Sequence, residues 1–169
     1  MIVKIKIPQN VEIIIQDNNL LKIKGKLGEI DLNLPKNISL KYDNSYIYGY
    51  SEDKAILGTF ISLLKTNIKG VSQGFTIKLQ LVGIGYRFLE VTNVLKLKIG
   101  FSHKMICKIP TSITVKIIKP TLLSISGINN QEIHHFADLI RSIKVPEVYK
   151  GKGIKYLDEK ITLKETKKK

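Results

Sequence analysis

Short segments in which hydrophobic and polar residues alternate fill the first part of the chain. Alternation over a few residues predicts strands of a half-buried sheet. Turn-forming residues such as Pro35-Lys36-Asn37 separate these segments. The strands expected here cover residues 11–16, 20–24, 29–34, 38–42 and 46–48, and residues 1–8 alternate in the same way.

A segment with helical periodicity comes next, over residues 52–69. Ser51 is the expected N-cap, and Gly70 is well placed to end the helix. Positions three and four apart lie on one face of a helix, so the pattern predicts one buried stripe. The stripe comprises Ile56, Phe60, Leu63, Leu64 and Ile68.

The second half repeats this order of elements. Strands are expected at residues 75–81, 86–91, 95–99, 105–109, 113–117 and 122–126. A helix is expected at 131–144, where Asn129 and Glu132 form a capping-box pattern, and Pro146 stops it. Its buried stripe would be Ile133, Phe136, Ala137, Ile140 and Ile143.

Two internal alignments of the halves compete. A shift of 102 pairs Gly25 with Gly127, and a shift of about 75 pairs Gly25 with Gly100. Only the shorter shift brings the two helices into register, so it predicts a duplication with a boundary near residues 72–82. The expected fold class is α+β: two tandem duplicated small domains, each a mainly antiparallel sheet with one helix packed on it, plus a basic C-terminal tail. The predicted domains are an N-terminal α+β repeat at 1–74, a C-terminal α+β repeat at 75–146 and a basic C-terminal extension at 147–169.

The net charge points to a polyanionic partner. The 169 residues include 28 basic and 14 acidic side chains, for a formal charge of +14, and 43% of residues are hydrophobic. A basic protein with enough apolar residues for a core is typical of nucleic-acid binding. Membrane-surface binding is the weaker alternative, because the lysines do not line one face of an amphipathic helix. No apolar run approaches the roughly 18 residues that span a bilayer.

Few residues are candidates for catalysis or metal binding. His134 and His135 are adjacent on the predicted helix and point about 100° apart, so they cannot easily chelate one metal. Gly83-Ile84-Gly85 lacks the third glycine of a dinucleotide site and is better interpreted as tightly packed backbone. Cys107 stands in a strand-like run and is interpreted as a small buried hydrophobe. We therefore predict no enzyme and no cofactor.

Lysines and glycines alternate between two tyrosines in Tyr149-Lys150-Gly151-Lys152-Gly153-Ile154-Lys155-Tyr156. Glycines let backbone N–H groups approach a phosphate, and lysines displace the counterions of a polyanion. A solvated, lysine-rich loop is the alternative interpretation. Because the segment 147–169 has few apolar anchors, we expect it to be mobile in the free protein and to become ordered on RNA.

Residues 146–154 match, without a mismatch, the signature segment of the large-subunit ribosomal protein six family in its bacterial form. Residues 78–87, 100–103, 23–29 and 164–169 resemble further parts of that family in the same order. The resemblance implies a duplicated α+β fold and a structural protein that binds large-subunit rRNA near the sarcin–ricin loop and the stalk base. Its partners would be rRNA and neighbouring large-subunit ribosomal proteins, with translational GTPases nearby and no membrane.

The resemblance also implies which residues contact rRNA. The family's motifs place these contacts at Tyr149, Lys150, Gly151, Lys152, Gly153, Lys155, Lys164, Lys167, Lys168, Lys169, Gly85, Tyr86 and Arg87. The N-terminus is shorter than the usual bacterial pattern and lacks its small, basic leading segment, which puts the contacts of that segment in doubt.

Two questions stay open at this point. A free-standing RNA-binding or assembly module outside the ribosome is the alternative function. The abundance of lysine and isoleucine, and the shortened N-terminus, favour a mitochondrial, organelle-encoded protein of the matrix over one from a plastid or the bacterial cytoplasm.

Overall fold

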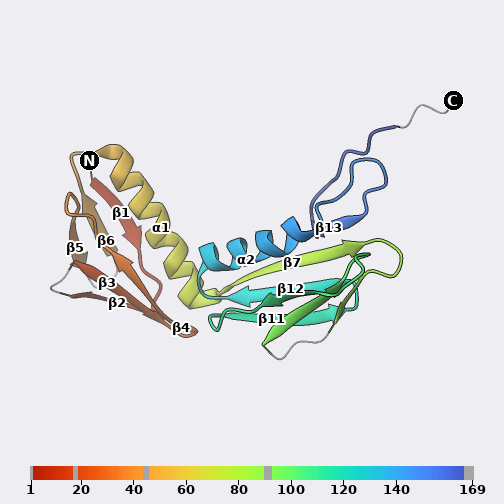
Figure 1. Ribbon diagram of the computed structural model, residues 1–169. Helices are drawn as coiled ribbons and strands as arrows, with labels where there is room; N and C mark the ends of the chain where they lie inside the picture. Colours follow the sequence, from red (N-terminus) through yellow and green to blue (C-terminus); the bar gives the residue numbers. More distant parts are fainter. Residues whose placement is uncertain (1, 17–18, 44–45, 90–92, 166–169) are drawn as a thin grey trace. The chain divides into compact units, whose positions relative to one another are not determined.

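The computed structural model describes residues 2–16, 19–43, 46–89 and 93–165, and forms two compact units (Figure 1). The first unit is Met1–Phe75 with Ile128–Asn130, and the second is Thr76–Gly127 with Gln131–Lys169. Each unit is an α+β domain with mainly antiparallel sheets and one long helix, as the sequence predicts. Whether residues 147–169 act as a separate RNA-binding extension stays a prediction.

Two three-stranded sheets and helix α1 (Lys54–Gln73) build the first unit. One sheet has the order β1 (Ile2–Lys6), β6 (Tyr46–Tyr50), β5 (Ser39–Asp43), and the other is the meander β2 (Val11–Gln16), β3 (Leu20–Gly25), β4 (Gly28–Asn33). The alternation of apolar and polar residues along the strands explains how the sheets pack. In β3, Leu21 and Ile23 are buried, whereas Lys22 and Lys24, on the opposite face, are not. Helix α1 packs against strands of both sheets and closes this core.

Helix α1 begins and ends later than the sequence predicts. Its N-cap is Asp53, whose backbone N–H donates to the Ser51 hydroxyl oxygen, and it ends at Gly74, with a φ of 73°. Gly70 therefore lies inside the helix, where an added Cβ would collide with the carbonyl oxygen of Ile128. A backbone contact, and not a helix end, requires this glycine. Of the predicted stripe, Phe60, Leu64 and Ile68 are buried.

The second unit repeats this topology. The meander β8 (Arg87–Leu89), β9 (Val94–Lys98), β10 (Met105–Lys108) corresponds to β2, β3 and β4. Strands β7 (Phe75–Val82), β12 (Leu122–Gly127) and β11 (Ile113–Lys119) stand in the order of β1, β6 and β5, and helix α2 (Asn130–Ile143) follows β12 as α1 follows β6. The predicted strand 86–91 is seen as β8, and its last two residues lie outside the described residues.

The two helices also bury corresponding positions. Leu57, Phe60, Ile61 and Leu64 of α1 match Ile133, Phe136, Ala137 and Ile140 of α2, each 76 positions later. The predicted offset of about 75 is thus confirmed within one residue. All but Ile143 of the predicted α2 stripe are buried.

One strand was not predicted. Strand β13 (Gly153–Tyr156) pairs antiparallel with β7 and extends the second sheet to the order β11-β12-β7-β13 (Figure 1). Its Ile154 side chain is completely buried. The expectation that the whole segment 147–169 lacks fixed structure without RNA is therefore wrong for this part, because sheet pairing and burial hold it in place.

Candidate nucleic-acid interface

The loop between α2 and β13 contains most of the predicted contacts and is held at both ends. Gly153 lies opposite Val82 and Ile154 opposite Leu81 in the β13–β7 pair. The Ile154 N–H donates to the carbonyl of Lys144 at 2.9 Å, just beyond α2. The loop 147–152 is therefore bounded by the helix on one side and by the sheet on the other.

The two glycines of this loop have structural roles. Gly151 has a φ of 67°, and its N–H donates to the carbonyl of Glu147 at 2.9 Å. Gly153 has a φ of 152°, and a Cβ there would come within 2.7 Å of the Pro146 Cα. The Gly151 N–H is thus already used within the loop. The glycines give the loop its shape, and phosphate contact by their backbone stays a prediction.

The side chains at the tip of the loop face solvent. Tyr149 is 51% exposed, and Lys150 and Lys152 are also exposed. Within the described ranges no ion pair involves either lysine. The tip therefore presents two free ammonium groups and an aromatic face on a defined backbone. The chain after β13 passes beside this loop, because the Lys164 N–H donates a hydrogen bond to the carbonyl of Val148 at 2.8 Å. The Lys164 side chain is exposed.

Lysine 155 has a different environment from its neighbours in the motif. It is half-buried, and its Nζ lies 3.5 Å from the carbonyl oxygen of Glu159. The structure gives it an internal partner, which weakens its case as an rRNA contact. The predicted contacts Lys167, Lys168 and Lys169 lie outside the described residues.

A network of charged groups fastens the chain after β13. The Arg141 guanidinium of α2 donates two hydrogen bonds to Glu159, at 2.6 and 3.2 Å, and this pairing holds the pKa of the Glu159 carboxyl below its usual value. The Tyr156 hydroxyl donates to Asp138 at 2.7 Å. Burial, together with that bond, raises the pKa of Tyr156 to about 12. Arg141, one of the two arginines of the chain, is therefore engaged in an ion pair within the protein.

A second loop lies beside the first, because Val82 at the end of β7 pairs with Gly153. In this loop the Tyr86 ring packs against Gly83 and Gly100, where added Cβ atoms would lie 2.8 and 3.1 Å from ring atoms. Tyr86 therefore has a packing role, and its contact with rRNA stays a prediction. Gly85, with a φ of 76°, and Arg87 are exposed.

The structure adds residues that were not predicted as contacts. Ile84 at the tip of the second loop is 96% exposed. The Phe101 ring stacks on His103 with centroids 6.3 Å apart, and Lys144 lies 4.9 Å from the Phe101 centroid. The available sequence signals were an apolar residue between two glycines, and an aromatic residue two positions before a histidine.

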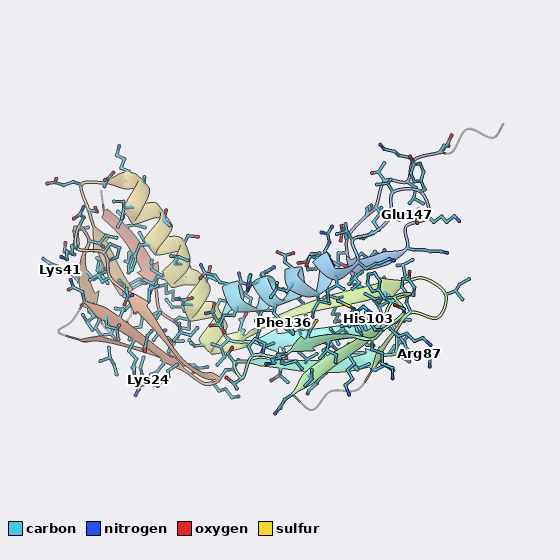
Figure 2. All side chains as sticks on the ribbon, viewed as in Figure 1. Lys24, Lys41, Arg87, His103, Phe136 and Glu147 are labelled. Atoms are coloured by element: carbon cyan, nitrogen blue, oxygen red, sulfur yellow. The ribbon has the colours of Figure 1, made fainter. Side chains whose placement is uncertain are left out.

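We call residues 83–87, 100–103 and 147–152 the loop end of the second unit. Figure 2 shows Arg87, His103 and Glu147 at this end. It combines free cations with flat or apolar side chains, a combination that suits phosphates together with bases or riboses.

The other candidate chemical groups lie apart from the loop end. His134 and His135 are exposed on α2, and the described residues contain no group of three or more His, Cys, Asp or Glu that could hold a metal. Cys107 is half-buried, and burial raises the pKa of its thiol. None of the helices in the described ranges is long and apolar enough to cross a membrane.

Comparison with known proteins gives consistent matches. The chain matches the family of ribosomal protein L6 over residues 7–74 and again over 82–157, ranges that begin 75 positions apart. It is 39% identical to large ribosomal subunit protein uL6 of Dictyoglomus turgidum over 165 residues, 95% of this chain and 92% of that protein. It is 40% identical to the uL6 of Acidovorax sp. (strain JS42) over 172 residues, 98% of this chain and 96% of that one. With the uL6 of Mycoplasma pneumoniae the identity is 41% over 164 residues, 93% and 89% of the two chains.

Proposed function

Because the chain belongs to the ribosomal protein L6 family, we propose that it is a structural constituent of the large ribosomal subunit and binds large-subunit rRNA through the loop end of its second unit. The observation that carries the rRNA site is the pair Lys150 and Lys152, which are exposed, without ion pairs within the described ranges, and held on a loop of fixed shape. The family is a class of structural proteins, and no enzymatic step is needed for this role.

Phosphate contacts supply most of the affinity in this account. Lys150, Lys152 and Arg87 neutralise phosphates and release counterions, which gives affinity and position with little sequence reading. Tyr149 and Ile84 offer faces for an unstacked base or a ribose, which is how proteins commonly contact irregular RNA. Since β13 fixes the base of the loop before RNA arrives, binding has to order mainly side chains and not backbone.

The location within the subunit is the finer part of the proposal. Its position near the sarcin–ricin loop and the stalk base, with translational GTPases nearby, rests on the family resemblance of the sequence. Neighbouring large-subunit proteins are the expected protein partners.

The proposed compartment is inferred from the organisms of the relatives. Dictyoglomus, Acidovorax and Mycoplasma are bacteria, which favours the bacterial cytoplasm. These relatives do not support the mitochondrial matrix that the composition favoured.

Co-sedimentation separates this function from that of a free-standing RNA-binding module. A structural constituent remains at one copy per large subunit after a high-salt wash, as other integral subunit proteins do. A chain released quantitatively by the wash, while those proteins stay, would support the free-standing module instead.

A further inference from the structure

The two units differ at one edge of their sheets. In the second unit, the free side of β7 is covered by β13 and by the chain that follows it. In the first unit, β1 is an edge strand, and the described residues provide no strand on its free side. We propose that this edge of the first unit binds an extended, acidic segment of a neighbouring protein, which adds a strand to β1 as β13 does to β7.

The repeat relates the two places residue by residue. Tyr46 and Leu122 begin β6 and β12 and lie 76 positions apart, as the helix positions do. Lys6 pairs with Tyr46, and the bond from the Leu81 N–H to the Thr121 carbonyl places Gln80 opposite Leu122, so Lys6 corresponds to Gln80, the partner of Lys155. On the helices, Leu64 corresponds to Ile140, and therefore Lys65 corresponds to Arg141 and Ile68 to Lys144. The residues that hold the C-terminal segment in the second unit thus have known counterparts.

A groove of about 270 Å³ lies where those counterparts meet. Its lining includes Ile5 and Lys6 of the edge strand and Lys65, Ile68 and Lys69 of α1. It therefore includes the equivalents of three residues that contact the C-terminal segment in the second unit, Gln80, Arg141 and Lys144. The groove thus corresponds to the place where Lys155 and the residues after it lie in the second unit.

The lining also determines what fits. Ile5 and Ile68 provide an apolar floor for an apolar side chain of the guest strand. Lys65 stands where Arg141 binds Glu159, five residues after Ile154, so the guest is expected to carry a carboxylate at that distance. Lys6 and Lys69 also line the groove, are exposed, and add to its attraction for acidic side chains.

These features favour a strand of another protein over the two alternative occupants, an RNA backbone and a second copy of this chain. An open sheet edge presents alternating N–H and C=O groups, which a second strand satisfies and a row of phosphates does not. A second copy of the chain would bring its own Lys4 and Lys6 against the same residues, and edge lysines disfavour such pairing.

The probe for this site is a capped synthetic peptide based on residues 153–160 with glutamate in place of both lysines, Gly-Ile-Glu-Tyr-Leu-Asp-Glu-Glu, which has the acidic character of the proposed guest. Titrated into the ¹⁵N-labelled full chain, it should shift the amide resonances of residues 3–7 and 65–69 and slow hydrogen exchange along β1. The Lys65→Glu variant should weaken this binding about tenfold or more, since it places like charges together. Lys54→Glu, on the same helix but outside the groove, makes the same change of charge and should leave affinity within about twofold. A peptide with aspartate in place of its isoleucine should not bind.

Several outcomes would overturn the proposal. Equal losses in the Lys54 and Lys65 variants would indicate unspecific charge attraction. Displacement of the peptide by an equimolar large-subunit rRNA fragment would make the groove an RNA site. Concentration-dependent dimers in which β1 becomes protected would make the occupant a second copy. Because Lys65 is exposed, its variant should fold normally, and Lys69→Glu provides a second test of the same charge requirement.

Discussion

The two units share a topology but differ in the course of the chain after the helix. After α1 the chain enters β7 within two residues, whereas after α2 it makes a longer connection and then returns to the sheet as β13. That return places exposed lysines at one end of the second unit and covers a sheet edge that the first unit leaves open. The comparison teaches that a short added strand is enough to give two copies of one fold different surfaces.

The strongest test of this difference removes the anchor of β13. Ile154 is completely buried, so Ile154→Ala should lower the free energy of unfolding of the second unit by about 2–5 kcal/mol through lost burial and the cavity left behind. Chemical denaturation, followed by hydrogen exchange of β7 and of β1, would measure the loss and its location.

The matched control for this substitution is Leu163→Ala. Leu163 belongs to the same C-terminal segment but is 53% exposed, and its loss should change stability by under about 0.5 kcal/mol. Equal effects of the two substitutions would mean that β13 does not stabilise the second unit, and a loss of protection in β1 would mean that the units are not distinct.

The local pattern of apolar and polar residues predicted most of the fold, because alternation and helical periodicity are properties of neighbouring residues. Strand β13 was missed because it is short and has a single fully buried apolar side chain. It also lies in a run of lysines and glycines, which is typical of loops. Its partner β7 lies about 70 residues earlier, and no local signal reports such a pairing. Pairing with β7 and the burial of Ile154 overrode the local preference.

The candidate site was predicted unevenly for a similar reason. Lysines at a loop tip are solvated wherever the loop lies, so Lys150 and Lys152 could be expected to be exposed. The internal roles of Tyr86, packed on two glycines, and of Lys155, beside the Glu159 carbonyl, depend on contacts that the local pattern does not report. Exposure of Ile84 could not be predicted from hydrophobicity, which favours burial.

A smaller expected effect is the loss of stability of the second unit at acidic pH. Arg141 lowers the pKa of Glu159 in the folded chain, so the pair stabilises the second unit above the unfolded pKa of a glutamate and loses that contribution as pH falls through the lower, folded value. The protection of the β13 amides against hydrogen exchange, taken relative to their intrinsic rates at each pH, should therefore fall on acidification below about pH 4.5 before that of β1 does. The effect is expected to be modest, about 1 kcal/mol or less, since both side chains are partly exposed.

Arg141→Gln provides the control for this pH dependence. It removes the charge that lowers the Glu159 pKa, and the acid-induced difference between β13 and β1 should shrink. An unchanged difference would assign the effect to other carboxylates.

The central claim is that the loop end of the second unit binds rRNA phosphates through Lys150 and Lys152. The most direct measurement is the salt dependence of binding to a large-subunit rRNA fragment, compared between the native chain, the Lys150→Gln/Lys152→Gln variant and the control Lys36→Gln/Lys54→Gln variant. All four lysines are exposed and both variants lose the same charge. The loop variant should reduce the slope of log affinity against log salt by about 0.7–0.9 for each lost phosphate contact, while the control keeps the native slope. Identical slopes in the two variants would contradict the account.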